Sequence, residues 1–126
     1  MPICLHRQVP DTTHMNVENT KAQMRKGVLE YCILSILAQG ELYPSDIIGK
    51  LKAAKLIVVE GTLYPLLTRL KDAGLLTYRW EESRSGPPRK YYKLTTVGDK
   101  FLNELDQTWD ELSQAVKKTT RKNASQ

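Results

Sequence analysis

Basic and hydroxyl-bearing side chains gather in one part of this 126-residue sequence. From Gly61 to Lys93 there are seven Lys or Arg residues and three Asp or Glu residues, a balance of +4. From Asp99 to Glu111 there are five acidic residues and one Lys, a balance of −4. Cations interspersed with hydroxyl groups are suited to contacts with phosphates and with base edges. The segregation of charge, in a chain of net charge +5, therefore favours one basic face and a nucleic-acid partner.

The residue types that catalysis and metal binding need are poorly represented. Cys4 and Cys32 form no CxxC pair, and neither His6 nor His14 stands at a ligand spacing from them. We therefore expect no disulfide, no metal site and no cofactor. Because the sequence contains no Gly-rich phosphate loop and no nucleophile–base pair, we predict that the chain is not an enzyme.

Two further features bear on where the protein works. The longest apolar runs are far shorter than a membrane span, and the first residues lack the basic and apolar regions of a signal peptide. We expect a cytoplasmic protein without a membrane partner, in which Met15 could be the natural start.

The spacing of apolar residues predicts the elements that must position the basic face. Apolar positions at steps of three and four residues mark helices, and two β-prone stretches around Ser83-Arg84-Ser85-Gly86-Pro87-Pro88 mark a hairpin. Pro65 fits a helix only if that helix begins near Glu60 or Gly61, because the amide that proline lacks would bond the carbonyl four residues back. We expect helices over residues 20–38, over about three turns from Tyr43-Pro44, over 61–73 and over 96–118, hairpin strands over 75–82 and 90–95, and a short strand over 56–59.

This order of elements is typical of a winged helix-turn-helix. We predict a mainly α fold with a small antiparallel β wing, followed by a long C-terminal dimerisation helix. The expected domains are a disordered N-terminal lead (1–19), the DNA-binding domain (20–96), the dimerisation helix (97–118) and a polar tail (119–126).

In such a fold the third helix reads the major groove and the wing follows the neighbouring backbone. Tyr64 could instead pack inside the protomer, Arg69 could form an intramolecular ion pair, and the remaining charges could be solvated surface. Candidate DNA contacts lie at the starts of the first two helices, on the outer side of the third helix and on the wing: Lys21, Arg25, Lys26, Tyr43, Ser45, Thr62, Tyr64, Pro65, Thr68, Arg69, Arg84, Arg89 and Lys90.

Three strings carry a family resemblance. They are Glu60-Gly-Thr-Leu-Tyr-Pro-Leu-Leu-Thr-Arg-Leu, Gly74-Leu-Leu and Gly86-Pro-Pro-Arg-Lys-Tyr-Tyr-Lys-Leu-Thr-Thr-Val-Gly98. Over about residues 24–116 the chain resembles the PadR family of transcriptional regulators, in its small branch with a single C-terminal helix. The resemblance implies a dimeric repressor whose C-terminal helix packs against its partner, which binds a pseudo-palindromic operator and which an effector often releases.

Apolar residues of the last helix would form a seam for a partner chain. A lone protomer would expose this strip, and a two-fold dimer would bury it and fix the distance between two recognition helices. Trp109 resembles in position a tryptophan that stacks on flat aromatic ligands in one multidrug-sensing group of the family. It could equally be a buried anchor of the dimer. The expected interface residues are Phe101, Leu102, Leu105, Trp109, Leu112 and Val116.

Taken together, these features predict a homodimeric regulator that binds duplex DNA sequence-specifically. The family resemblance implies that it is a repressor released by an effector, which the position of Trp109 suggests is a small aromatic compound. Two alternatives stay open. One is a winged-helix protein-interaction module without specific DNA binding, and the other is an RNA-binding module, which would call for exposed stacking aromatics on a sheet.

Overall fold

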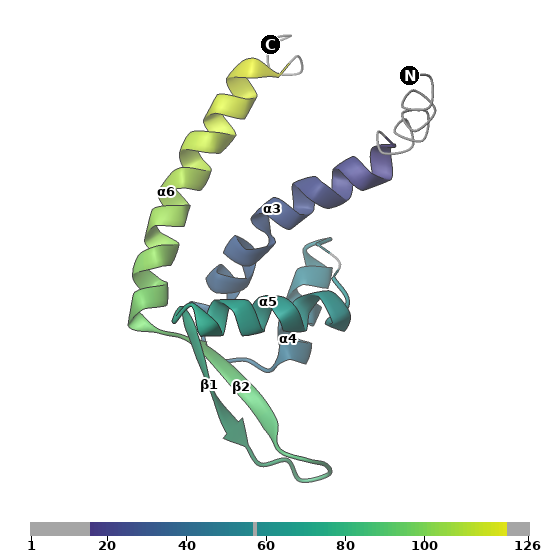
Figure 1. Cartoon of the computed structure of the whole chain (residues 1–126), viewed down its shortest axis with the longest axis vertical. Coiled ribbons are helices and arrows are strands. Elements are labelled where there is room, and N and C mark those ends of the chain that lie inside the picture. The colour runs from purple at the N-terminus through teal and green to yellow at the C-terminus, as the bar shows by residue number, and fades with distance from the viewer. Residues whose placement is uncertain (1–15, 57, 121–126) are drawn as a thin grey trace, which may run out of the picture. The chain divides into compact units, whose positions relative to one another are not determined.

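The computed structural model describes residues 16–56 and 58–120. In chain order its elements are α3 (Val17–Leu37), α4 (Pro44–Ala53), α5 (Glu60–Asp72), β1 (Leu76–Glu81), β2 (Arg89–Leu94) and α6 (Thr96–Thr119) (Figure 1). Three helices, an antiparallel hairpin and a long last helix make the predicted winged helix-turn-helix with its C-terminal extension. None of the helices within these residues combines the length and the hydropathy of a membrane-spanning segment.

The chain divides into two units, Met1–Glu30 and Tyr31–Gln126, and α3 contributes to both. This helix begins at Val17, three residues earlier than predicted. The side chain of Asn16 accepts a hydrogen bond of 2.8 Å from the Asn19 amide, which is the geometry of an N-cap. Most of the predicted lead lies outside the described residues, including Cys4, His6, His14 and Met15. Residues 121–126 of the predicted tail lie outside them as well.

Leucine and isoleucine side chains build the core of the Tyr31–Gln126 unit. Helices α4 and α5 turn their apolar stripes inward, as the three- and four-residue spacing requires. Cys32 is half-buried, and burial raises the pKa of its thiol. The core residues of this unit include Ile33, Leu34, Leu37, Ile47, Leu51, Leu63, Leu67, Leu70, Leu75, Leu76, Tyr92 and Leu102.

Helix α5 begins at Glu60, as the prediction from Pro65 required. The amide missing at Pro65 would have bonded the Gly61 carbonyl, so one hydrogen bond near the start of the helix is lost. At the other end Gly74 adopts a φ of 84°, and the Leu75 amide donates to the Leu70 carbonyl over 3.0 Å. A glycine in the left-handed region with this bond is a Schellman ending, which turns the chain directly into the hairpin.

The predicted strand over 56–59 is wrong. Of its described residues, Leu56, Val58 and Val59 lie outside any strand, and Val59 precedes α5 as its N-cap residue. The edge of β2 is occupied instead by Leu42, whose amide and carbonyl exchange hydrogen bonds of 3.0 and 2.8 Å with Tyr92. Of the described residues of this run, Val58 is buried in the core, whereas Val59 keeps 65% of its surface exposed.

The start of α6 is fixed to the root of the hairpin. The Thr95 hydroxyl accepts a 2.9 Å bond from the Gly98 amide and donates to the Gly74 carbonyl at 2.7 Å. Gly98 packs against the Leu75 carbonyl and the Leu94 side chain, where a Cβ would not fit. Because the buried residues of α6 are Gly98 and Leu102, only its first two turns join the core, and the remainder of the helix projects from it (Figure 1).

Candidate nucleic-acid interface

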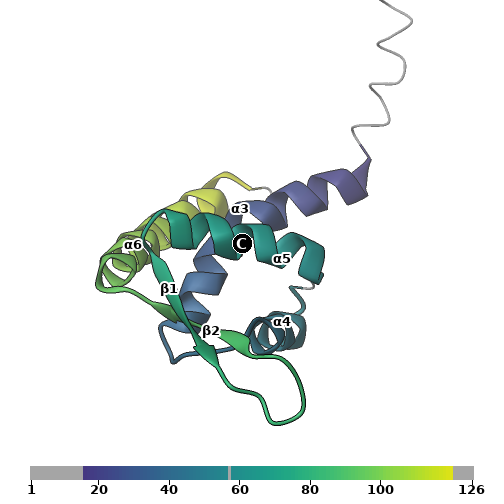
Figure 2. The same ribbon diagram turned by 60° about the horizontal axis from the view of Figure 1, so that its bottom comes forward.

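A groove of about 430 Å³ runs between the start of α4, the outer side of α5 and the wing. Figure 2 shows how α4, α5 and the two strands of the wing are arranged. Hydroxyl, aromatic and cationic side chains meet there, which is the mixture that phosphates, sugars and base edges require. The groove is lined by Tyr43, Pro44, Ser45, Glu60, Tyr64, Thr68, Trp80, Pro88, Arg89, Lys90 and Tyr92.

Helix α5 sends two of its predicted contact residues into this groove. Tyr64 and Thr68 lie one turn apart and are both exposed, while Leu63 and Leu67 point into the core. Tyr64 is therefore available to a ligand and is not part of the core. The other predicted residues of α5, Thr62, Pro65 and Arg69, are exposed on the helix but do not line the groove.

One face of the wing carries a lysine above two aromatic rings. Lys90 Nζ lies 4.5 Å from the ring centre of Tyr78 and 5.6 Å from that of Trp80, its partner in the strand register. Trp80 keeps 61% of its surface exposed and lines the groove. Sequence reasoning did not select Trp80 as a site residue, because only the register of the hairpin places it on the face that turns toward α5.

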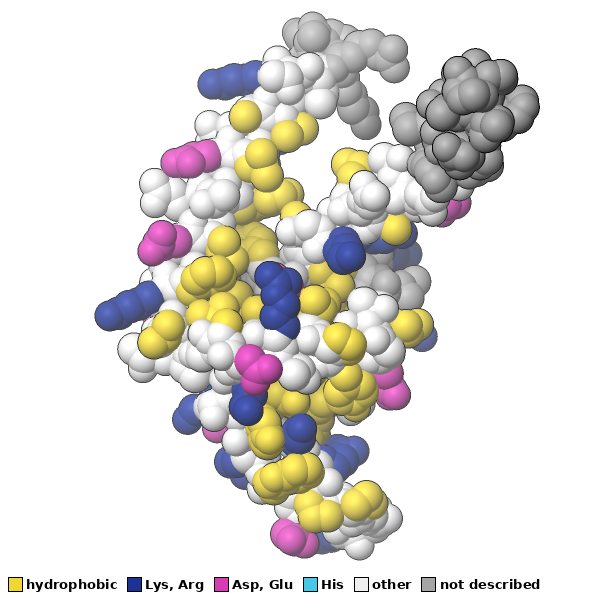
Figure 3. Space-filling view, in the orientation of Figure 1, with side chains coloured by type: hydrophobic (Ala, Val, Ile, Leu, Met, Phe, Trp, Pro, Cys, Tyr) yellow, Lys and Arg dark blue, Asp and Glu magenta, His cyan; other side chains and the backbone are white. Residues whose placement is uncertain are grey.

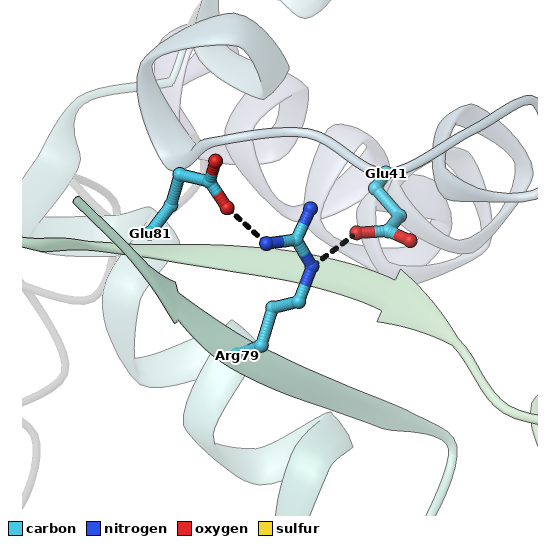
Figure 4. Close-up of polar contacts among 3 residues, drawn as sticks. All are labelled: Glu41, Arg79 and Glu81. Atoms are coloured by element: carbon cyan, nitrogen blue, oxygen red, sulfur yellow. Dashed lines mark hydrogen bonds and ion pairs between the residues drawn. The ribbon is translucent and has the colours of Figure 1, made fainter. Parts of the chain in front are cut away.

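The opposite face of the wing carries two arginines with different surroundings. Arg79 is paired with Glu81 and, over 3.1 Å, with Glu41 (Figure 4). Hydrogen bonding to Glu81, and then to Glu41, raises the pKa of the Arg79 guanidinium. Arg89 is exposed, and its guanidinium carbon lies 4.0 Å from the ring centre of Tyr43. Arg84, at the tip, is exposed and lies outside the groove.

The predicted basic residues of the first helix lie in the other unit of the chain. Lys21, Arg25 and Lys26 are exposed on α3, and Lys21 forms an ion pair of 3.7 Å with Glu18. An exposed pair at this spacing is weak, so it leaves Lys21 able to exchange partners.

Helix α6 exposes most of the predicted seam. Phe101, Trp109, Leu112 and Val116 keep between 42% and 51% of their surface exposed, and hydrophobic side chains run along this helix in Figure 3. Leu105 is half-buried. Leu102 corrects the prediction, because it is only 5% exposed and belongs to the core of its own protomer.

Trp109 has an aromatic neighbour that sequence reasoning missed. The ring of Tyr31 lies 6.3 Å from that of Trp109, and the Tyr31 hydroxyl donates a 2.6 Å hydrogen bond to Asp106. This bond, followed by burial and the negative charge of Asp106, raises the pKa of Tyr31 to about 12. Tyr31 and Trp109 come from helices far apart in sequence, so only the fold brings them together.

The chain resembles proteins of one family. Residues 33–104, more than half of the chain, match the transcriptional regulator PadR-like family. The X-ray structure of a PadR-like transcription factor from Bacteroides fragilis is 62% identical in sequence, with a TM-score of 0.69, and the match covers 81% of this chain and 99% of that one. The chain belongs to the PadR-like family of transcriptional regulators. The family predicted from the motifs of α5 and the wing is thereby confirmed.

Other PadR-like proteins are more distant. A PadR family regulator from Eggerthella lenta DSM 2243 is 33% identical with a TM-score of 0.75, over 81% of this chain and 89% of that one. The crystal structure of Bacillus subtilis PadR in complex with operator DNA matches at 32% identity and a TM-score of 0.58, over 62% of this chain and 46% of that one. The negative transcriptional regulator PadR of that organism is 33% identical over 84 residues, which are 44% of its length.

Proposed function

We propose that this PadR-like regulator is a repressor that binds duplex operator DNA as a homodimer. The observation that carries the proposal is the groove, which is lined both by Tyr64 and Thr68 of α5 and by Arg89 and Lys90 of the wing. A recognition helix in a major groove beside a cationic ribbon on the backbone is how winged helices bind DNA. The complex of the related Bacillus subtilis PadR with operator DNA adds support.

The side chains have separate roles in this proposal. Thr62, Tyr64 and Thr68 contact base edges with their hydroxyl groups, and Arg69 and Pro65 border the same surface. Arg84, Arg89 and Lys90, with Tyr43 and Ser45 at the start of α4, contact phosphates and fix the register. Residues Lys21, Arg25 and Lys26 would supply additional phosphate contacts. In this scheme residues 20–96 form the DNA-binding region, and the protein works where the chromosome lies, in the cytoplasm.

The exposed stripe on α6 supports the homodimer. Phe101, Trp109, Leu112 and Val116 stand on one side of a helix whose later turns have little cover in their own protomer. A self-complementary two-fold contact over residues 97–118 would bury them and suit a pseudo-palindromic operator. We expect Leu112→Glu to give a monomer in sedimentation or light-scattering measurements, while Gln114→Glu, on another side of α6, leaves the dimer intact. If both variants were dimeric, or both monomeric, the result would contradict this interface.

An effector would act at the same interface. Tyr31 and Trp109 present two rings beside the seam, and a flat aromatic compound could stack against them. A compound that binds the dimer better at one separation of the two recognition helices than at another would shift operator affinity. Quenching of Trp109 fluorescence that parallels release of DNA would support this role, and release without quenching would contradict it.

A salt titration of DNA binding tests the proposal. With about six phosphate contacts in a dimer, the logarithm of the affinity for a duplex should fall against the logarithm of salt concentration with a slope of about −5. A slope near zero, or no binding to random-sequence duplex at low salt, would favour the protein-interaction module. Tighter binding of single-stranded RNA than of duplex DNA would favour the RNA-binding alternative.

A further inference from the structure

A row of side chains crosses the outer face of the wing, and it is produced by the register of three segments. Arg79 of β1 stands opposite Tyr91 of β2. Because Leu42 pairs with Tyr92 in an antiparallel bridge, the next residue, Tyr43, stands beside Tyr91. Neighbours in such a row are within contact distance across the strands.

The contacts in this row are continuous from one arginine to the other. The Arg79 guanidinium carbon lies 4.7 Å from the ring centre of Tyr91, and the rings of Tyr91 and Tyr43 are also 4.7 Å apart. Arg89 then covers the ring of Tyr43 at 4.0 Å. The row therefore consists of two half-buried tyrosines in contact with each other, with an arginine stacked on each of them.

The two ends of the row differ in their charge neighbours. At one end Glu41 and Glu81 bind Arg79 and fix it to the segment that precedes α4 (Figure 4). At the other end Arg89 lines the groove, and none of the ion pairs within residues 16–56 and 58–120 involves it. Stacking occupies the flat face of a guanidinium and leaves the N–H donors in its plane free for a phosphate.

From these contacts we infer that Tyr43 is a positioning residue, which holds the Arg89 guanidinium in the groove before DNA arrives. A free arginine side chain loses rotamer freedom when it binds, so an arginine already ordered on a ring binds more tightly. Tyr91, Arg79 and Glu41 anchor the ring of Tyr43 and act through it. This role replaces a direct contact between the Tyr43 hydroxyl and DNA, and it rests on the proposed function.

A double-mutant cycle on Tyr43 and Arg89 tests the inference. The affinity for a fluorescein-labelled random-sequence duplex is measured at low salt for wild type, Tyr43→Leu, Arg89→Ala and the double variant. A cation–π contact of this kind predicts that Tyr43→Leu weakens binding about fivefold in the presence of Arg89 and not at all in its absence. Tyr43→Phe, which keeps the ring, should bind within about twofold of wild type.

Two results would overturn the inference. An equal loss from Tyr43→Leu with and without Arg89 would show that Tyr43 affects binding independently of Arg89, and a loss from Tyr43→Phe as large as that from Tyr43→Leu would assign the effect to the hydroxyl. A purely structural role would lower binding regardless of Arg89. It would therefore also give an equal loss in both backgrounds.

A measurement on the wild-type protein covers the case in which Tyr43→Leu does not fold. The ring of Tyr43 should move the Arg89 δ-proton resonances upfield in the free protein, and unshifted resonances would contradict the stacked arrangement. If Arg89→Ala binds duplex as wild type does, the DNA role of the wing fails, while the upfield shift can still be present. The two failures are therefore distinguishable.

Discussion

Replacement of Gly98 by alanine should destabilise the protein, although alanine is normally the better helix residue. A Cβ at this position would overlap the Leu75 carbonyl oxygen and stand 2.9 Å from the Leu94 side chain. Because one of these neighbours is backbone, α6 must shift away from the hairpin root. The shift also strains the 2.9 Å cap between Gly98 and Thr95.

The expected size of the effect follows from three contributions. Overpacking costs roughly 1–3 kcal/mol, a weakened cap adds about 1 kcal/mol, and the helix preference of alanine returns about 0.5–1 kcal/mol. We therefore expect Gly98→Ala to lose about 2 kcal/mol of unfolding free energy and to lower Tm by several degrees. Circular-dichroism melts at one protein concentration measure this, since the Tm of the proposed dimer would depend on concentration.

Gly49 in α4 is a matched control. It is exposed, and a Cβ there would meet nothing within 4 Å. Gly49→Ala should therefore raise stability by about 0.5–1 kcal/mol. If Gly98→Ala melted as high as Gly49→Ala, the close approach of α6 to the hairpin root would be refuted.

The remaining predictions concern the seam, the pH response and the groove. Leu102→Ala should lower the free energy of unfolding by about 3 kcal/mol with no specific effect on dimer affinity. Leu112→Ala should instead weaken the dimer and leave the protomer core unchanged. The reverse pattern would place Leu102 in the interface. The pKa of Tyr31, raised to about 12, means that its bond to Asp106 contributes stability below about pH 10 that is lost as pH rises through about 12, so the stability difference between wild type and Tyr31→Phe should vanish over that interval. An absorbance titration should find this tyrosine near its ordinary pKa in Asp106→Asn, and an unchanged titration would argue against the hydrogen bond. The chain has two tryptophans, so the fluorescence of Trp109→Phe reports on Trp80 alone and that of Trp80→Phe on Trp109 alone. The Trp80 fluorescence should change when duplex DNA is added, and the Trp109 fluorescence should change when a dimer dissociates on dilution. A Trp80 fluorescence that does not change with duplex would place this residue outside the DNA contact.

The helices were predictable because burial and apolar spacing agree. Leu63, Leu67 and Leu70 repeat at helical steps and all point inward, and Pro65 correctly limited where α5 begins. The end of α5 was also predictable, because glycine is the residue type favoured in the left-handed conformation that Gly74 adopts just after the helix.

Which segments pair with the strands of the hairpin could not be predicted from the sequence. The β-branched run over 56–59 has strand propensity, yet the edge of β2 accepts Leu42, a single residue without a run around it. A propensity states what a segment could form and not which partner is free. The same limit hid Trp80 and Tyr91, whose faces follow from the hairpin register, and Tyr31, which meets Trp109 only in the folded unit.

Leu102 was assigned to the seam because it stands beside the apolar stripe of α6. Its burial depends on Gly98, one turn earlier, which lets the first turns of the helix lie against the hairpin root. Helical spacing alone does not separate residues that face the core of their own protomer from those that face a partner.

The central claim is that the groove between α5 and the wing binds duplex DNA. Its most direct test compares Arg89→Gln/Lys90→Gln with Lys117→Gln/Lys118→Gln, which removes the same charge from exposed positions near the end of α6. The wing variant should weaken binding and reduce the salt slope from about −5 to about −2, because a dimer loses up to about four phosphate contacts. The α6 variant should keep the affinity and slope of wild type. Equal losses in the two variants, or no loss in either, would contradict the claim.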